Sequence, residues 1–460
     1  MGVFRRRVGE GGVAKGEGRS GGSLGPAQLL AVGGMLFSMF FGAGNLILPP
    51  LLGLQAGEAA VPAMAGFLAA GIGLPVLGIV AAAACGGAHE LAGRVGPRFA
   101  SAFVALVYLT IGPLLAIPRT SSTAFEMLRP LLPATDATGL GVAAVAFSVV
   151  FFGVAFALAL RPGLLSRVLG RFSAPILIAL IVLVVAASVL DGAPAPMQPR
   201  APYDEGPASH GFLAGYQTMD LLAALCFGIV VAANVRELGV SDPRRVAGSI
   251  SGAGLVAGAL MAAIYCGLAF AGMAMGSSMP DATNGASILA ASASLHFGAA
   301  GAIIVAAIFL LACLNVCTGL ISCCSEYFSE AFPRIPLPAW AAVFAAFSCG
   351  VSLAGLDAIL AFSSPLLGAL YPPAIVLVAM GLVHALCDRL RRMWPAAVLT
   401  TAVCSVCVAL RDALAPGLWL PLDALPFADA GLGWLLPAAA GAVVGAAWSF
   451  AERRRLGKKA

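Results

Sequence analysis

Apolar residues occur along the chain in long uninterrupted runs, and short polar stretches separate one run from the next. A helix needs about 20 residues to cross the hydrocarbon core of a bilayer, so each run of about 18 or more mostly apolar residues predicts one span. The predicted spans are 27–52, 59–85, 100–128, 140–160, 172–190, 212–235, 246–275, 298–325, 337–355, 358–386, 394–412 and 431–450. The pattern predicts an all-α polytopic membrane protein of about twelve transmembrane helices, surrounded by the lipid bilayer.

The composition excludes a water-soluble protein. The 460 residues are 60% hydrophobic and 10% charged, with a mean hydropathy of +0.97, whereas globular domains carry about 25% charged residues. Most of the eleven cysteines lie inside apolar runs, where cysteine behaves as a small hydrophobic residue. The net charge of +5 resides in short loops and tails, so membrane topology explains it better than nucleic-acid binding.

Basic residues favour one side of the membrane. With a cytoplasmic N-terminus, 22 of the 26 Lys and Arg residues fall in cytoplasmic loops and tails, and the exceptions are Arg119, Arg129, Arg200 and Arg411. Cytoplasmic loops are enriched in basic residues, and one missed span would reverse all later loops. The charge pattern therefore predicts an even number of spans in the cell membrane, with both termini cytoplasmic.

The tails differ from the rest of the chain. Residues 1–25 are rich in Gly and Arg and predict a disordered cytoplasmic tail, and 451–460 predict a basic cytoplasmic tail. Between them, 26–455 reads as one transmembrane domain.

Several enzyme classes are excluded by absent motifs. The three lysines are Lys15, Lys458 and Lys459, so the chain has no phosphate-binding loop ending in Gly-Lys-Ser/Thr. It also lacks His-Glu-x-x-His, and no Cys/His spacing fits a zinc site. A carrier, a channel or an unusual membrane enzyme remains, and no obligatory protein partner is evident.

The first span contains residues that weaken a helix at membrane depth. Gly42, Gly44 and Asn45 lie in its middle, and Pro49 and Pro50 follow. Irregular backbone survives in a membrane only where protein or a water-filled cavity satisfies its polar groups. Close helix packing through small residues is the alternative explanation. We expect an unwound binding segment here.

Span 6 contains a second candidate break at 215–220, where an ionisable Asp220 lies inside the span. Charges at membrane depth are costly and usually functional, although Asp220 could equally be a structural partner of a buried donor. Spans 1 and 6 each begin a five-helix half. Inverted-repeat carriers show this correspondence and hold their substrate at the two broken helices.

Polar residues on other spans suggest further roles. In span 3, Arg119 and Glu126 lie seven residues apart on one helical face, as an outer gate pair or an ordinary ion pair. In span 8, the stripe 315–322 suits either cation coordination or hydrogen bonding between helices. The Gly-x-x-x-Gly sequences of span 7, at 248–258, predict helix packing only.

Four stretches of the chain, in this order, resemble the BrnQ-type branched-chain amino acid carriers (the LIVCS family of the APC superfamily). They are Phe-Phe-Gly-Ala-Gly-Asn-Leu-Ile-Leu-Pro-Pro at 40–50, Ile-Gly-Pro-Leu-Leu-Ala-Ile-Pro-Arg-Thr at 111–120, Tyr-x-Thr-Met-Asp at 216–220 and the run 313–329. The resemblance covers the chain from about residue 27 to the end of span 12. It implies cation-coupled uptake of Leu, Ile and Val. It also implies a LeuT-like five-plus-five inverted repeat (about 27–190 and 212–386) with two extra helices at 394–450.

The resemblance also implies a substrate site at the two breaks. Amides at Gly42 and Gly44 would face the substrate carboxylate, while carbonyls near Phe40 and the Asn45 side chain would accept from the ammonium group or a cation. The span 6 break would form the other wall, and Tyr108 matches a pocket tyrosine by position only. The expected substrate residues are Phe40, Gly42, Gly44, Asn45, Tyr108, Thr218, Asp220 and Phe227.

A sodium site is implied less clearly. Its residues would be Ser38, Phe41, Ala312 and Asn315, with Thr318 as a shifted ligand. Val316 stands where sodium-coupled relatives of LeuT carry a hydroxyl, so proton coupling stays open, and no other cofactor is expected. A carrier of other neutral or aromatic amino acids is the alternative within the class, and a channel or a membrane enzyme is the alternative outside it.

Overall fold

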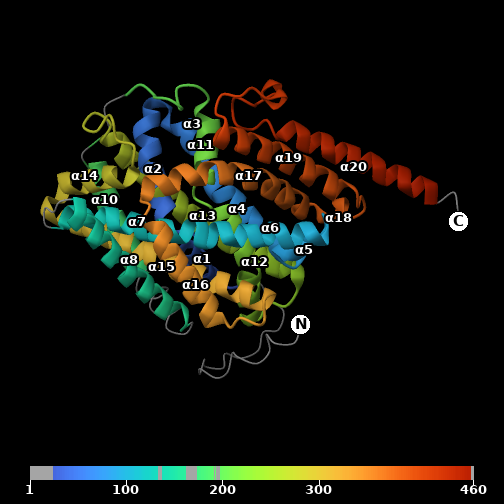
Figure 1. Cartoon of the computed structure of the whole chain (residues 1–460), viewed down its shortest axis with the longest axis horizontal. Coiled ribbons are helices and arrows are strands. Elements are labelled where there is room, and N and C mark those ends of the chain that lie inside the picture. Colours follow the sequence, from blue (N-terminus) through green and yellow to red (C-terminus); the bar gives the residue numbers. More distant parts are fainter. Residues whose placement is uncertain (1–23, 133–136, 162–173, 191, 193–196, 457–460) are drawn as a thin grey trace.

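The computed structural model describes residues 24–132, 137–161, 174–190, 192 and 197–456, and every regular element within these ranges is helical. Figure 1 shows the arrangement. The helices are α1 (Pro26–Phe40), α2 (Ala43–Ala56), α3 (Ala60–Leu68), α4 (Leu74–Cys85), α5 (Ala88–Gly93), α6 (Pro97–Leu109), α7 (Ala116–Leu128), α8 (Ala137–Ala159), α10 (Ala174–Leu190), α11 (Pro207–Tyr216), α12 (Asp220–Glu237), α13 (Pro243–Ala274), α14 (Gly285–Phe297), α15 (Ala299–Ala331), α16 (Leu337–Ser352), α17 (Leu356–Leu382), α18 (His384–Cys387), α19 (Met393–Leu414) and α20 (Leu435–Leu456). The all-α fold class is confirmed.

Each predicted span coincides with one helix or with consecutive helices. In the described part of the chain, eight helical stretches are long and apolar enough to cross a membrane: Ala43–Cys85, Pro97–Leu131, Thr138–Ala159, Pro243–Ala274, Ala299–Ala331, Leu356–Leu382, Met393–Leu414 and Leu435–Arg455. Four apolar helices are shorter, at Pro26–Phe40, Pro175–Leu190, Gly285–Phe297 and Leu337–Ser352. The first half of span 1, Pro26–Phe40, is among the shorter helices because the span is interrupted after Phe40.

The structure differs from the sequence prediction at two places. Helix α14 was not predicted, because its 13 residues are too few for a span. Helix α20 continues through the basic residues up to Leu456, so the first part of the predicted C-terminal tail is helical. Most of the predicted N-terminal tail (1–23), the basic residues Arg167 and Arg171, and the final residues 457–460 lie outside the described residues.

Two groups of closely packed helices surround the interrupted spans. In the first, α1 and α2 lie along α13, while α3 lies along α11 and α4 along α12. In the second, α15 packs against α7, α8 and α16, and α16 packs against α8; Figure 1 shows these helices gathered at the lower left. The groups meet where α1 touches α15 and α2 touches α7. Both interrupted spans belong to the first group.

Glycines bring the backbones of the first group into direct contact. A side-chain carbon at Gly53 or Gly272 would collide with a backbone carbonyl across the α2–α13 crossing. The same is true of Gly66 and Gly211 across the α3–α11 crossing. Small residues permit such close approach between membrane helices. In these helix pairs the two backbones are therefore in direct contact, with no side chain between them.

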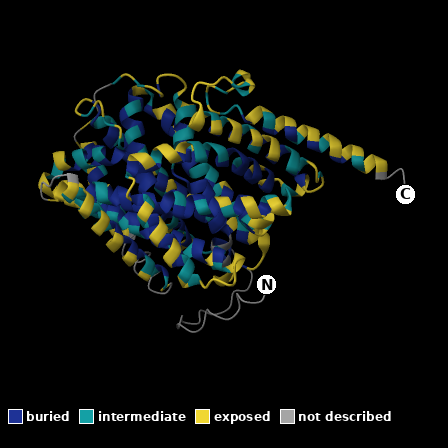
Figure 2. Cartoon of the chain, in the orientation of Figure 1, coloured by how far each residue is buried: buried dark blue, intermediate teal, exposed yellow. Residues whose placement is uncertain are grey.

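The outer faces of the bundle are apolar. Figure 2 shows buried residues concentrated in the middle of the molecule and exposed residues along α8 and the projecting α20. Large aliphatic side chains stand exposed on both helices, including Val150 at 64% and Val443 at 69%. Exposed apolar surface of this extent suits contact with lipid chains.

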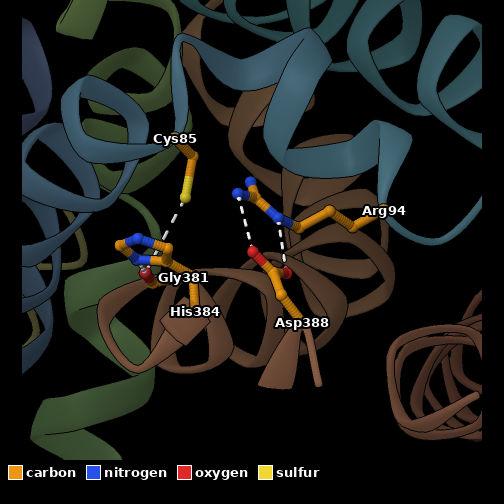
Figure 3. Close-up of polar contacts among 5 residues, drawn as sticks. All are labelled: Cys85, Arg94, Gly381, His384 and Asp388. Carbon is orange, nitrogen blue, oxygen red and sulfur yellow. Dashed lines mark hydrogen bonds and ion pairs between the residues drawn. The ribbon is translucent and has the colours of Figure 1, made fainter. Parts of the chain in front are cut away.

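Loops that the charge pattern assigns to the cytoplasm meet in the structure. Arg94, after α5, donates from Nε to Asp388 Oδ1 at 2.9 Å and from Nη2 to Oδ2 at 3.3 Å. Figure 3 shows this ion pair beside Cys85 Sγ and His384 Nδ1, which both approach the carbonyl of Gly381, at 3.7 and 2.9 Å. The ion pair ties the end of span 2 to the end of span 10.

Loops assigned to the opposite side also meet one another. The Glu58 amide donates to the Met197 carbonyl at 3.0 Å, and the Arg200 amide donates to the Gln55 carbonyl at 2.9 Å. The Arg200 side chain also donates to the Pro280 carbonyl. Among the described residues, these contacts join loops that the predicted alternation of spans puts on one side of the membrane.

Candidate functional site

The first predicted break is present and is short. Helix α1 ends at Phe40 and α2 begins at Ala43, so only Phe41 and Gly42 lie outside a helix. The Gly42 amide donates to Asn45 Oδ1 at 3.1 Å, which satisfies one of the free amides at the start of α2. The paired prolines, which the sequence suggested as part of the weakness, remain inside α2.

The second predicted break is also present. Helix α11 ends at Tyr216 and α12 begins at Asp220. Between them, Met219 has a φ of 66°, a left-handed conformation that is uncommon for a residue with a side chain. Thr218 Oγ1 donates to a carbonyl of α11 at 2.8 Å and accepts from the Asp220 amide at 3.4 Å. The threonine thereby bridges the two half-helices.

Three buried side chains join the two breaks. Asn45 Nδ2 donates to Asp220 Oδ2 at 2.7 Å, and the Asn45 side chain also hydrogen bonds to the Tyr265 hydroxyl. The exposed fractions are 2% for Asn45, 3% for Asp220 and 0% for Tyr265. Tyr265 lies on α13 and was not among the predicted site residues, because the glycines of that span predicted helix packing only. The sequence did contain a signal for this residue, because Tyr265 is the only tyrosine in the otherwise apolar and small-residue span 246–275.

A cavity of about 30 Å³ lies between the breaks. It is lined by Met39, Phe40, Gly42, Ala43, Gly44, Asn45, Ile111, Ala116, Arg119, Thr120, Thr218, Met219, Asp220, Ala223, Phe227, Val316 and Leu320. Seven of the eight expected substrate residues are in this lining. Space of this size holds about two water molecules, so an amino acid could enter only if the walls move apart.

The eighth expected substrate residue, Tyr108, lies elsewhere. Its ring stacks on Tyr327 of α15 with centroids 4.1 Å apart and planes at 9°. Its backbone carbonyl accepts from Cys324 Sγ at 3.5 Å. The lining of the cavity, as far as the described residues go, does not include Tyr108, and its contacts are those of a packing residue between α6 and α15.

Arg119 and Glu126 do not form the expected pair in this structure. Arg119 is buried, and its Nη1 donates to the Gln217 carbonyl at 2.7 Å, inside the second break. Glu126 instead lies 3.6 Å from Arg129 Nη1, at the edge of α7. Two turns of helix separate Arg119 from Glu126, about 10 Å along the axis, so a direct contact between them on one straight helix is too long.

A third interruption, in span 3, was not predicted. Residues Thr110–Leu114 form a π-helical turn, and Gly112 has non-helical angles of φ −89° and ψ −121°. The Leu115 amide then reaches back five residues to the Thr110 carbonyl at 3.2 Å. The sequence signal was Gly112 followed by Pro113, since proline removes a helical hydrogen bond. This kink turns Arg119, in the first turn of α7, toward the cavity.

Of the residues expected to bind sodium, Ser38 lies on α1 and Phe41 in the first break, and the others lie on α15, which contacts α1. Thr318 Oγ1 donates to the Leu314 carbonyl at 2.6 Å, which leaves its lone pairs available to a cation. Ser38 and Asn315 add oxygen donors of the kind that hard cations prefer, whereas Phe41 and Ala312 offer only backbone carbonyls. All of these candidate ligands are oxygen atoms, which is the ligand type that Na⁺ prefers.

Val316 occupies the side of α15 that faces the first break. A side-chain carbon built at Gly42 would lie 3.0 Å from Val316 Cγ2, so the valine methyl groups cover the unwound backbone. Methyl groups cannot coordinate a cation. Among the expected residues of α15, the side-chain oxygens that could bind sodium are therefore those of Asn315 and Thr318.

Comparison with protein families and curated proteins gives consistent matches. Residues 26–452 match the family described as branched-chain amino acid transport protein. The chain is 35% identical over 427 residues to the branched-chain amino acid permease BraB of Bacillus subtilis, covering 92% of this chain and 96% of that protein. It is 38% identical over 433 residues to the permease BrnQ of Corynebacterium glutamicum, with coverage of 92% and 96%. It is 35% identical over 435 residues to the permease BrnQ of Escherichia coli, with coverage of 93% and 97%.

Among solved structures, the chain resembles Mhp1, a nucleobase-cation-symport-1 family transporter. The closed conformation of Mhp1 with bromovinylhydantoin bound gives a TM-score of 0.60 at 14% identity, covering 92% of each chain. The inward-facing conformation gives 0.56 at 15% identity, covering 94% of this chain and 95% of that one. At this identity the likeness shows a shared fold.

Proposed function

The chain belongs to the branched-chain amino acid transport protein family, and on that basis we propose that it imports leucine, isoleucine and valine together with a cation, Na⁺ or H⁺. Its named relatives are permeases and carriers, so the chain is a membrane transporter and not an enzyme. The proposal places it in the cell membrane with both termini in the cytoplasm.

The observation that carries the proposal is the convergence of two interrupted helices on one buried cavity. The Asn45–Asp220 hydrogen bond brings the first turns of α2 and α12 together. Helix ends carry partial charges, positive at N-termini and negative at C-termini. A cavity bounded by the end of α1 and the starts of α2 and α12 offers both signs within a few residues, which suits the ammonium and carboxylate groups of an amino acid.

The rest of the lining supports an aliphatic substrate. Phe40 and Phe227 face one another with ring centroids 6.1 Å apart, and Ile111, Val316 and Leu320 add aliphatic surface. Burial of one methylene is worth about 0.8 kcal/mol, or about fourfold in affinity. Leu, Ile and Val should therefore bind with similar strength. A charged side chain would be excluded because its charge would be buried without a partner.

The cation coupling rests on two candidate groups. The oxygen donors of Ser38, Asn315 and Thr318 support sodium, while the buried Asp220 carboxyl group supports a proton. Ser38 precedes the first break on α1, and Asp220 is hydrogen bonded to Asn45 in the first turn of α2, so each candidate connects cation binding with the first break.

The cytoplasmic placement of the termini rests on the basic residues of the even-numbered loops. The contacts within each set of loops, such as Arg94 with Asp388, support this arrangement because they join loops that the charge pattern puts on the same side.

Uptake by the purified protein in proteoliposomes tests the proposal. We expect uptake of labelled leucine that unlabelled isoleucine and valine inhibit and that lysine and glutamate do not. The uptake should require an inward gradient of Na⁺ or of H⁺, and each gradient is imposed in a separate experiment. Choline replaces Na⁺ in the control for the first, and a membrane-permeable buffer removes the pH gradient in the control for the second. Absence of exchange between labelled and unlabelled leucine would reject a leucine carrier. Strong inhibition by phenylalanine would indicate a broader neutral amino acid carrier.

A further inference from the structure

A buried cation faces the cavity from the second group of helices. Arg119 lies in the first turn of α7 and is 3% exposed. Its guanidinium group is part of the cavity lining, opposite the start of α2. Long charged side chains are almost never fully buried unless they are paired, so the partners of this arginine decide what it does.

Not all N–H donors of Arg119 have a hydrogen-bond acceptor among the described residues. Nη1 donates to the Gln217 carbonyl at 2.7 Å. Nη2 lies against Gly44, where a side-chain carbon would be 2.5 Å away. Nε is buried and has no hydrogen-bond partner among the described residues. A guanidinium group has five N–H donors and no acceptor, so the group retains donors for an anion in the cavity.

The electrostatic surroundings also favour an anion. The guanidinium group lies at the N-terminal turn of α2, where free amides already create partial positive charge. A cation at the N-terminus of a helix is electrostatically unfavourable. An anion between the guanidinium group and the free amides of α2 would be attracted by both. Asp220, in contrast, lies at the start of α12, where a carboxylate is stabilised, and it is held by Asn45.

We propose that Arg119 binds the α-carboxylate of the transported amino acid and thereby makes the site selective for amino acids over simple amines. The inference rests on the proposed function and deepens it. It also reassigns a role that the sequence gave to the Gly42 amide, because that amide already donates to Asn45. Planar guanidinium groups bind carboxylates through two parallel hydrogen bonds, and the missing side chain at Gly44 lets the guanidinium group lie against the start of α2.

Competition by two ligands that differ only in the carboxylate tests the proposal. Uptake of labelled leucine by wild type, R119K and R119Q is inhibited with leucine or with isoamylamine, the amine that leucine becomes without its carboxylate. R129Q is the matched control, because Arg129 lies outside the cavity and pairs with Glu126. For R119Q, exchange at high leucine concentration supplies the measurable signal, and gel filtration reports whether the protein is folded.

We expect R119Q to weaken leucine binding by about thirtyfold or more, the loss typical of truncating one partner of a buried charge pair. Isoamylamine binding should change by less than about threefold, so the preference for leucine collapses. R119K should fall between wild type and R119Q, since it keeps the charge without the planar fork. R129Q should behave as wild type.

Equal weakening of both ligands would overturn the proposal, because it would mean that Arg119 only supports the shape of the site. Unchanged leucine binding in a folded R119Q would overturn it as well. If R119Q does not fold, the ligand preference of R119K decides between the same outcomes. Absence of leucine exchange by the wild-type protein would instead reject the proposed function. Exchange by the wild type is therefore measured before any variant is compared with it.

Discussion

Asn45 donates a hydrogen bond of 2.7 Å to Asp220 across 175 residues of sequence, and this bond joins the two interrupted helices at their first turns. The hydroxyl of Tyr265 bonds to the same asparagine side chain from α13. All three side chains are buried, so none of them can exchange its partner for bulk water.

Tyr265→Phe removes one hydrogen bond from this network and keeps the ring. We expect the KM for leucine to rise about fivefold, since a buried hydrogen bond contributes about 1 kcal/mol. Initial uptake rates over a range of leucine concentrations measure the effect. Tyr327→Phe is the control, because its stacking on Tyr108 is retained. An unchanged KM in Tyr265→Phe would show that the hydroxyl does not position Asn45.

Asp220→Asn keeps an oxygen that can accept from Asn45 but removes the charge. If the coupling ion is a proton, we expect exchange of leucine to survive at saturating concentration while accumulation driven by a pH gradient is lost. If the ion is sodium, the variant should need more Na⁺ for the same uptake. Asp281→Asn, in an exposed loop, serves as control. Loss of exchange and accumulation together would identify Asp220 as a structural residue.

A side chain at Gly44 would displace the Arg119 guanidinium group. Gly44→Ala places a carbon 2.5 Å from Arg119 Nη2, and we expect a large rise in the KM for leucine; Gly44→Leu should abolish uptake while membrane insertion stays normal. Gly34→Ala is the matched control on α1, because nothing lies within 4 Å of its added carbon. Normal transport by Gly44→Leu would contradict the placement of the pocket.

Phe227→Ala enlarges the apolar side of the cavity. The variant should bind valine more weakly, because the ring is lost as a contact surface. Phenylalanine should begin to compete with leucine, since the space beside Phe40 is opened. Inhibition of labelled leucine uptake by each amino acid measures the change in selectivity. The same inhibition profile in wild type and variant would place the substrate side chain elsewhere.

The Arg94–Asp388 pair should contribute modestly to stability. Its geometry is bidentate, and the guanidinium group also lies 5.4 Å from the ring centre of Trp394, but both side chains are partly exposed. We expect a coupling free energy of about 0.5–1 kcal/mol from a double-mutant cycle of Arg94→Ala and Asp388→Ala. Thermal unfolding in detergent measures it, and high salt should weaken it. Additive losses in the two single variants would mean that the ion pair contributes nothing.

The sequence predicted most of the fold because membrane spans leave a strong local signal. Length and hydropathy placed each span within a few residues, and Gly42 and Asp220 marked the two breaks, since glycine and a charge are both unfavourable inside a membrane helix. The prolines at 49 and 50 suggested a wider interruption, but both lie inside α2, where each removes one helical hydrogen bond without ending the helix.

Long-range contacts were the part that the sequence could not supply. The bond from Tyr265 to Asn45 depends on how α13 crosses α2, and no periodicity in either span encodes that crossing. Likewise, Arg119 and Glu126 share a helical face in sequence, yet the kink at Gly112 directs Arg119 into the cavity and Glu126 remains at the edge. Tyr108 was assigned by position alone, and its stacking partner lies more than two hundred residues away.

The backbone contact at Gly53 and Gly272 has a mechanical consequence. Because α2 and α13 touch without intervening side chains, they resist sliding and move as one piece that carries Asn45 and Tyr265, with Asp220 bonded to it. Arg119 travels with the other piece, on α7. The separation between the buried anion and the buried cation therefore changes whenever the two pieces tilt against each other. The width of the cavity that both residues line therefore depends on how the two groups of helices are oriented.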